Sequence, residues 1–186
     1  DYNTVDIGLN TLHNIVLPPF KAAVDAGVKT FMNSFNDLNG IPATADAYLQ
    51  RDLLKGAWGF NGFVVSDWGS LREMMDHGYA KDRKHAGELA LNGGSDMDME
   101  SYIYFEELEG LIKEKKVTLA QIDDAVKRIL RVKYELGLFD DPYRYLDEKR
   151  EKEVIGSQEI LDGVLDMAKK SIVLLKNEKQ TLPLKK

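Results

Sequence analysis

Hydrophobic residues recur at helical spacing along most of the chain. The spacing predicts a first helix over about residues 10–26, which Pro18-Pro19 breaks or restarts and Gly27 ends. Asp46 can cap a second helix that runs to about Gly56. Further helices are predicted at about residues 71–76, 82–91, 101–115 and 118–136, the last with a capping box of Thr118 and Gln121.

Short apolar segments alternate with these helices. Val28–Phe31 is predicted to be a buried strand, and the unbroken apolar core of residues 62–68 is typical of a strand buried on both faces. A third segment, residues 93–99, is too short to assign by periodicity. Alternation of strand and helix predicts a parallel sheet with helical crossovers, and therefore an α/β fold.

The pattern changes after Phe139. Residues 139–156 are charged and aperiodic, which predicts an exposed linker or surface excursion, because burying so many charges would cost too much solvation free energy. A helix at about residues 158–170 is followed by Ile172–Lys176, which is predicted to be a buried strand. The last apolar residues of the sequence are Leu182 and Leu184, which flank Pro183.

Composition narrows the class of protein. The 186 residues are 44% hydrophobic, enough for a packed core, and the net charge of −6 argues against nucleic acid as a partner. There is no cysteine, and the three histidines lack ligand spacing, so no metal site is expected. No apolar run approaches the ~20 residues of a membrane helix, and no signal segment opens the chain. Because the chain starts without Met, it is expected to be a fragment or a processed product.

Asp67 is the first candidate for chemistry. It directly follows the apolar strand core, and in parallel α/β folds the carboxyl ends of the strands form the site. The alternative is that Asp67 only caps the next helix. The indole of Trp68 offers an apolar face on which a sugar ring can stack, or it packs within the fold.

Two other segments carry polar side chains at predicted strand ends. Asp96 and Asp98 alternate with Met97 and Met99, so one set can face the site, and core packing is the favoured interpretation for the methionines. The loop Asn33–Asn36 suits recognition of sugar hydroxyls, or is a turn that satisfies its own side chains. No phosphate-binding glycine motif and no GxSxG motif is present.

Six consecutive blocks of the sequence resemble glycoside hydrolase family 3, especially its bacterial β-glucosidases. They cover nearly the whole chain, in order: DYNTVDIG, LPPFKAAVDAGVKTFMNSFNDLNGIPATAD, LLKGAWGFNGFVVSDWGS, LNGGSDMDM, AVKRILRVKYELGLFDDPY and AKKSIVLLKNEKQTLPLKK. The resemblance implies part of a TIM-like (β/α)8 barrel followed by an α/β sandwich domain. Residues 1–139 would be the C-terminal half of the barrel, residues 140–170 a linker and helix, and residues 171–186 the start of the sandwich domain.

The same resemblance implies roles for four residues. Asp67 would be the catalytic nucleophile and Trp68 would line the sugar subsite, while Met32 and Phe35 fall in the block that borders it. Phe35 stands where many members carry Tyr, so a hydroxyl contact made there would be missing. The family's other glycosyl-binding residues, an Asp, an Arg and a Lys-His pair, would lie in the earlier half of the barrel and its acid/base Glu in the second domain, all outside this chain.

The activity implied is that of a retaining exo-β-glucosidase that acts without a cofactor on β-linked glucosides or oligosaccharides. Its partners would be the missing N-terminal half-barrel and C-terminal domain, in the same protein or in a complementary chain, with no nucleic acid or membrane. The resemblance implies a periplasmic or secreted location. The alternatives are a β-xylosidase or β-N-acetylglucosaminidase of the same mechanism, or a non-catalytic structural or carbohydrate-binding fragment.

Overall fold

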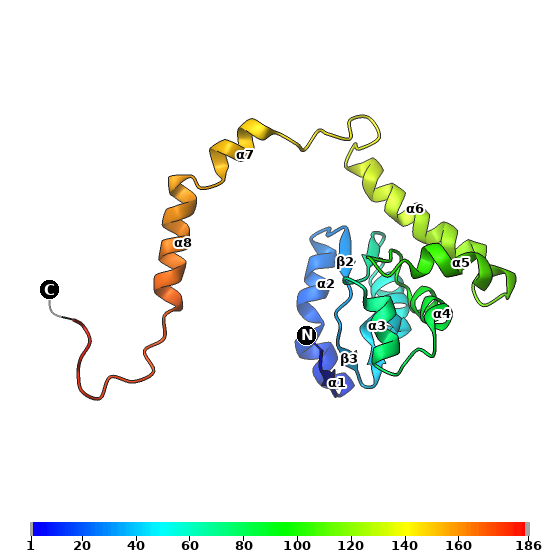
Figure 1. The fold of residues 1–186 in the computed structure, drawn as a ribbon, viewed down its shortest axis with the longest axis horizontal. Helices are drawn as coiled ribbons and strands as arrows, with labels where there is room; N and C mark the ends of the chain where they lie inside the picture. Colours follow the sequence, from blue (N-terminus) through cyan, green and yellow to red (C-terminus); the bar gives the residue numbers. More distant parts are fainter. Residues whose placement is uncertain (1, 185–186) are drawn as a thin grey trace. The chain divides into compact units, whose positions relative to one another are not determined.

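The computed structural model describes residues 2–184 and divides into two compact units (Figure 1), Asp1–Phe139 and Asp140–Lys186. Asp1 and residues 185–186, the ends of the predicted barrel and sandwich segments, lie outside the described residues. The assignment of these units to a barrel domain and a sandwich domain remains a prediction.

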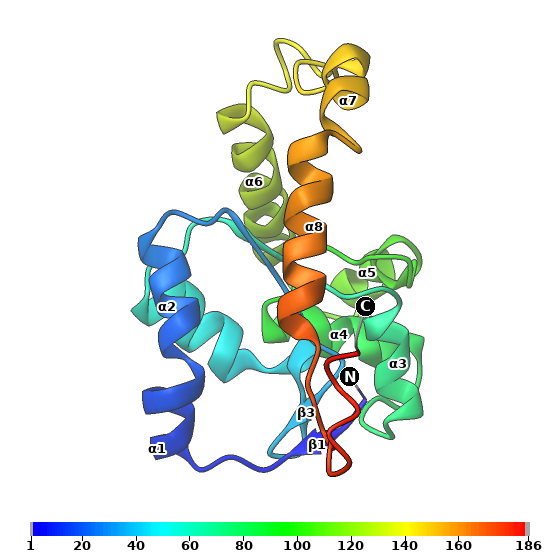
Figure 2. The same cartoon turned by 90° about the vertical axis from the view of Figure 1, so that its left-hand side faces the viewer.

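The first unit contains two small sheets. One is the parallel pair β2 (Thr30–Met32) and β5 (Phe63–Val65), which Met97 extends through a parallel bridge to Val65. The other joins β1 (Thr4–Val5) in parallel to β3 (Asp37–Leu38), with β4 (Ile41–Pro42) antiparallel to β3 (Figure 2). The predicted α/β fold with parallel strands and helical crossovers is confirmed.

Helices connect and cover these strands. In chain order the first unit has α1 (Leu9–Thr11), the wide π-type turn η1 (Leu12–Val16), α2 (Pro18–Asp25), η2 (Ala43–Ala45), the π-type helix η3 (Tyr48–Ala57), α3 (Ser70–Asp76), α4 (Arg83–Gly93), α5 (Ile103–Lys113) and α6 (Leu119–Glu135). The predicted break in the first helix occurs at Leu17, because Pro18 restarts the helix as its first residue. The predicted capping box of α6 is confirmed.

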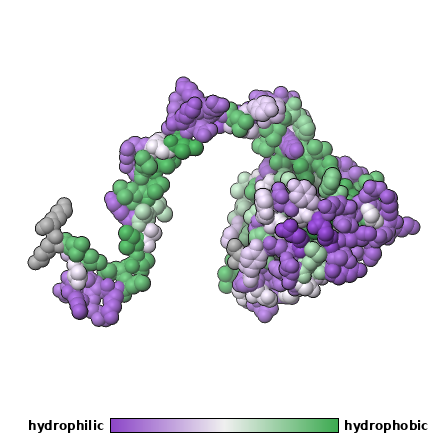
Figure 3. All heavy atoms as spheres, in the orientation of Figure 1, coloured by the Kyte–Doolittle hydropathy of each residue, from purple (hydrophilic) through white to green (hydrophobic). Residues whose placement is uncertain are grey.

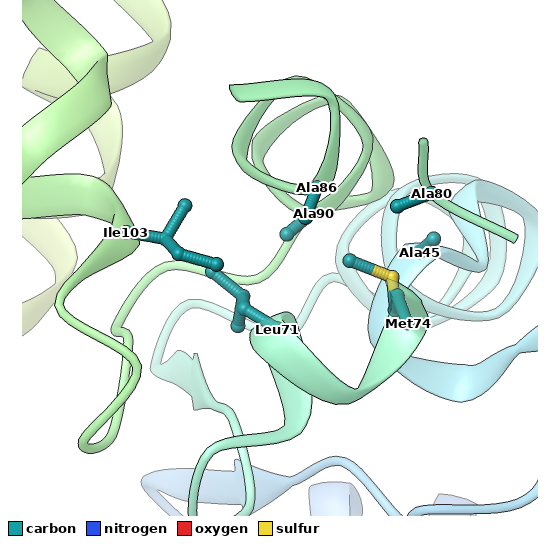
Figure 4. Packing of buried hydrophobic residues seen from close by; sticks show 7 residues of the cluster. All are labelled: Ala45, Leu71, Met74, Ala80, Ala86, Ala90 and Ile103. Atoms are coloured by element: carbon teal, nitrogen blue, oxygen red, sulfur yellow. The ribbon is translucent and has the colours of Figure 1, made fainter. Parts of the chain in front are cut away.

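A core of small and large apolar side chains fixes α3, α4 and α5 against one another. Figure 4 shows Leu71, Met74 and Ile103 gathered around Ala86 and Ala90 of α4. The two alanines lie four residues apart, on one face of the helix. Because their side chains are so small, α4 can approach both neighbouring helices closely. The helix that follows Asp67, α3, is therefore packed into this core through Leu71 and Met74.

The second unit contains α7 (Glu148–Val154) and α8 (Gln158–Ser171). Residues 140–156 are all exposed, as predicted, although they include the short helix α7. The predicted strand at Ile172–Lys176 is wrong: these residues form no strand and Leu175 is 91% exposed. A buried strand needs a sheet to pair with, and none of the described residues of this unit provides one. Figure 3 shows hydrophobic surface along α8, where Ile160, Leu161, Val164, Leu165 and Met167 are exposed.

Candidate active site

The site lies where three parallel segments end side by side. Met32 of β2 pairs with Val65 of β5, and Val65 bridges to Met97. The next backbone bonds continue this row, with Asn33 N donating to Val65 O at 3.0 Å and Ser66 N to Met97 O at 2.9 Å. The loops after Met32, Val65 and Met97 therefore emerge at the same edge, as expected for the carboxyl ends of parallel strands.

Asp67 occupies the turn between β5 and α3. Its side chain is half-buried and its Oδ1 accepts a hydrogen bond of 2.6 Å from its neighbour's amide, Trp68 N. Helix α3 begins after Gly69, which has a φ of 71° and no side-chain cap. The alternative interpretation, in which the Asp67 side chain caps α3, is therefore wrong. The carboxylate remains at the mouth of the turn.

The turn is fixed by the segment that follows the third strand end. The Ser66 hydroxyl, fully buried, donates to Asp67 O at 2.9 Å and accepts from Met99 N at 2.8 Å. Gly69 N returns a bond to Met99 O at 2.8 Å. The residues on both sides of Asp67 are therefore attached to the backbone of Met99, which holds the turn that carries the carboxylate.

Asp96 and Asp98 have structural roles. Asp96 accepts Val64 N at 2.8 Å and pairs with Lys55 Nζ at 2.6 Å, the two side chains being only 5% and 7% exposed. Burial lowers the pKa of Lys55, with the charges of Arg128 and Arg51 acting in the same direction and Asp96 opposing them. Asp98 accepts the amides of Ile103 and Tyr104 and so caps α5.

The methionines between these carboxylates behave differently from the prediction. Met97 is 41% exposed and Met99 is half-buried, so the favoured interpretation of core packing is wrong. The reason is the period of two along an extended segment: since Asp96 turns inward to Lys55 and Val64 N, its neighbour Met97 must turn outward.

The aromatic and apolar candidates surround this edge. Trp68 is 61% exposed and Met32 is 58% exposed, as suits side chains that contact a ligand. Phe35 is half-buried, and its ring stacks on that of Tyr2 with centroids 4.7 Å apart. Asn33 instead turns inward, where its Nδ2 donates to the buried Ser95 Oγ at 2.7 Å.

Tyr2 and Glu73 are neighbours of the site that sequence reasoning missed. The Tyr2 hydroxyl donates to Glu73 Oε1 at 3.4 Å, although 71 positions separate the two residues. Partial desolvation, followed by the negative charges of Glu73 and Asp67, raises the pKa of Tyr2. No spacing in the sequence signals this contact, because it depends on how β1 and α3 are placed in the fold.

The start of β5, the strand that leads to Asp67, is held by a side chain of α6. Arg128 of α6, whose side chain is 15% exposed, donates through Nη1 to the carbonyls of Phe60 and Gly62 at 3.1 and 3.0 Å. Because Gly62 directly precedes β5, the strand is anchored at its start by α6 and beyond its end by Met99.

A cavity of about 330 Å³ opens beside β2 and β5. Met32 and Asn33 are among its lining residues, but most of its lining is apolar and comes from the first helices, η3 and the strands. Neither Asp67 nor Trp68 lines it. The cavity is therefore adjacent to the candidate active site and not a part of it.

Two structural features of the described part of the chain bear on other kinds of function. Among residues 2–184, no group of three or more His, Asp or Glu side chains is arranged to hold a metal ion. Over the same residues, no helix has the length and apolar character needed to cross a bilayer.

Comparison with known proteins gives concordant matches. Residues 1–132 match the family described as "Glycosyl hydrolase family 3 N terminal domain". The chain is 46% identical to a periplasmic beta-glucosidase of Salmonella typhimurium, aligning over all of this chain and 25% of that protein. It is 38% identical to a beta-xylosidase of Formosa agariphila, over 96% of this chain and 26% of that one.

A solved structure matches nearly all of the chain. The crystal structure of beta-glucosidase from Listeria innocua in complex with glucose has a TM-score of 0.85 and 41% identity, covering 99% of this chain and 25% of the other. This chain thus spans about a quarter of the length of the relatives that it matches.

Proposed function

Because this chain belongs to glycosyl hydrolase family 3, we propose that it carries Asp67 as the nucleophile of a retaining exo-β-glucosidase. The interactions of the three aspartates near the strand ends support this proposal. Asp96 is buried in an ion pair and Asp98 caps a helix, whereas Asp67 forms no ion pair with any residue from 2 to 184. Of the three, Asp67 is the carboxylate available to react.

The proposed reaction is a double displacement. A carboxylate oxygen of Asp67 attacks the anomeric carbon, the bond to the leaving oxygen breaks, and a general acid protonates that oxygen. Water then attacks the same carbon, its proton passes to the acid residue now acting as base, and Asp67 is released as a carboxylate. Two inversions leave the product in the β configuration, and two carboxylates suffice without a cofactor.

The proposed general acid is a Glu from the second domain of the whole protein, as the family pattern implies. In a retaining enzyme it must come within about 5–5.5 Å of the nucleophile. The glycosyl-binding Asp, Arg and Lys-His pair are likewise proposed to come from the preceding half of the barrel. Within this chain, Trp68, Met32 and Phe35 would contact the sugar.

The proposed substrates are β-linked glucosides or oligosaccharides. The similarity to the Salmonella beta-glucosidase and to the glucose-bound Listeria structure supports glucose as the sugar. The similarity to the Formosa beta-xylosidase favours a second candidate, β-xylosidase activity by the same mechanism. Specificity constants for 4-nitrophenyl β-glucoside and β-xyloside, measured on the full-length protein, would rank the two.

Covalent trapping tests the nucleophile. A 2-deoxy-2-fluoroglucoside should label the full-length protein on the one peptide that contains Asp67, and Asp67→Asn should abolish labelling and lower turnover by orders of magnitude while leaving the melting temperature nearly unchanged. Asp98→Asn is the matched control, because it keeps a capping oxygen for α5 and should still be labelled at Asp67. Labelling at Asp96 or Asp98, or a product of inverted configuration, would overturn the proposal.

The domain organisation is also a proposal. Residues 1–139 are taken as the C-terminal half of the barrel, residues 140–170 as a linker and helix, and residues 171–186 as the start of the sandwich domain. The division of the structure after Phe139 and the exposure of residues 140–156 support it. Limited proteolysis should cut first between residues 140 and 156, and first cleavage within Phe63–Trp68 would count against it.

A periplasmic or secreted location is proposed from the Salmonella relative, which is described as periplasmic. Fractionation of cells that produce the full-length protein would test this. The non-catalytic alternative would be supported if the full-length protein bound β-glucosides but neither hydrolysed them nor accepted the fluoroglucoside label.

A further inference from the structure

Tyr2 presents an exposed aromatic ring next to the candidate site. Its ring stacks on Phe35 with an interplanar angle of 25°, and its side chain is 64% exposed. Phe35 covers one face of the ring, and Phe35 has no polar atom to pair with the phenolic hydroxyl. The hydroxyl must therefore find its partners elsewhere.

The hydroxyl is directed toward the helix that follows Asp67. Its partner Glu73 lies in the first turn of α3, and the amide of Glu73 donates to Gly69 O at 3.1 Å. Gly69 belongs to the turn that presents Asp67. The hydroxyl is thus placed by two groups, Phe35 from the β2 loop and Glu73 from the nucleophile's helix.

The contact between Tyr2 and Glu73 is incomplete. At 3.4 Å it is longer than an ordinary O–H···O hydrogen bond, so the phenol can redirect its proton or accept one from another hydroxyl. Glu73 Oε2 is buried and has no hydrogen-bond partner among the described residues. A polar pair left weakly bonded beside a binding site is suited to complete its bonds with a ligand.

We propose that Tyr2 is a further substrate-contacting residue, whose hydroxyl bonds to one sugar hydroxyl of a β-glycoside bound at Asp67. This inference rests on the proposed function. Glu73 acts through Tyr2 as a positioning residue that holds the phenol toward the turn. The side chain is a neutral phenol at neutral pH, so its hydroxyl can both donate and accept a hydrogen bond.

The proposal also accounts for the phenylalanine at position 35. In the family pattern many members carry Tyr there, so any hydroxyl contact made at that position would be missing here. Tyr2 stacks on Phe35 and supplies a phenolic hydroxyl from β1's side of the site instead. The aromatic surface and the hydroxyl are then shared between two residues.

The test combines substitutions in the full-length protein with substrates that lack single hydroxyls. Tyr2→Phe keeps the stacked ring and removes the hydroxyl, and Tyr134→Phe, an exposed tyrosine of α6, is the matched control. Tyr2→Phe should lower kcat/KM for 4-nitrophenyl β-glucoside by about threefold to tenfold, the range for one neutral hydrogen bond. Tyr134→Phe should not change it, and both variants should melt within a degree or two of the wild type.

Monodeoxy glucosides identify the bonded hydroxyl. For one deoxy position, Tyr2→Phe should cause no further loss, because both partners of one hydrogen bond are then absent. Glu73→Gln should raise KM for the parent glucoside when position 2 is the native tyrosine, but not when it is added to the Tyr2→Phe variant. Additive losses at every deoxy position, or unchanged kcat/KM in Tyr2→Phe, would overturn the inference. Fluoroglucoside labelling of Asp67 in the Tyr2→Phe protein reports separately on the proposed function.

Discussion

The backbone amide of Met99 donates a hydrogen bond of 2.8 Å to the hydroxyl of Ser66, the residue immediately before Asp67. The same hydroxyl donates to the carbonyl of Asp67, so one buried oxygen joins the Asp67 turn to the neighbouring segment. The position of Asp67 is therefore determined by backbone groups as much as by its own strand.

Ser66→Ala should destabilise the protein and slow covalent trapping. Removing the hydroxyl leaves the Met99 amide without its partner, and we expect the free energy of unfolding to fall by about 1–3 kcal/mol. Urea denaturation measures this, and the labelling rate of the full-length protein reports on Asp67. Ser34→Ala, at an exposed hydroxyl, is the control for stability. Equal stability of the two variants would mean that the Ser66 bridge contributes nothing.

Lys55→Met should be strongly destabilising. It leaves the carboxylate of Asp96 buried without its cation, and removing one partner of a buried ion pair typically costs about 3–5 kcal/mol. Lys113→Met is the matched control, because its pair with Glu109 is highly exposed and should contribute little. Chemical denaturation of both variants checks the contrast, and similar losses would argue against the burial effect.

Asp46→Asn should change how stability depends on pH. Burial, the largest cause, raises the pKa of Asp46 above 3.8, against the amides of Leu49 and Tyr48 that lower it. The folded state therefore binds the proton of the Asp46 carboxyl more tightly than the unfolded state does. The stability that this proton contributes is fully present below pH 3.8 and is lost as the pH rises through the pKa of folded Asp46. The wild type should therefore gain stability relative to Asp46→Asn on acidification from neutral pH.

The asparagine keeps an oxygen that can accept the Leu49 amide, which Asp46 binds at 2.9 Å, so the comparison isolates the charge. Urea denaturation of both proteins between pH 4 and neutral, roughly the range in which a raised carboxyl pKa falls, measures the difference. A stability difference that stays constant across this range would contradict the prediction.

Gly62→Ala should disturb the pairing of β2 with β5. An added Cβ would lie 2.0 Å from the backbone oxygen of Lys29, so the strand must move, and we expect a loss of about 1–3 kcal/mol or more. Gly110→Ala is the control in helix α5, where the nearest atoms lie at 3.5 Å. That substitution should be neutral or stabilising by about 0.5–1 kcal/mol. Thermal melting of both variants tests the sign of each effect.

Much of the fold was predictable because local signals determine it. The capping box at Thr118 and the apolar run Phe63–Val65 gave a helix and a strand where the structure has them. The inward turn of Asp96 and the outward turn of Met97 were not predictable, because either face of a short strand can be buried until its partners are known. The strand expected at Ile172–Lys176 failed for a related reason, since strand formation depends on pairing.

The site was predictable in part. Position after an apolar strand and the family pattern both made Asp67 the candidate nucleophile, which stays a prediction, and the structure places it just beyond the end of β5, which is flanked by β2 and the bridge to Met97. Tyr2 could not be identified in this way, because its relation to Glu73 and Phe35 arises only when distant segments come together.

The attachment of the Asp67 turn to Met99 involves only the amide and carbonyl of that residue. The side chains of Met97 and Met99 take no part in these hydrogen bonds, and Met97 is exposed. Substitution of these two side chains would therefore reshape the surface beside Asp67 and leave in place the hydrogen bonds that hold its turn.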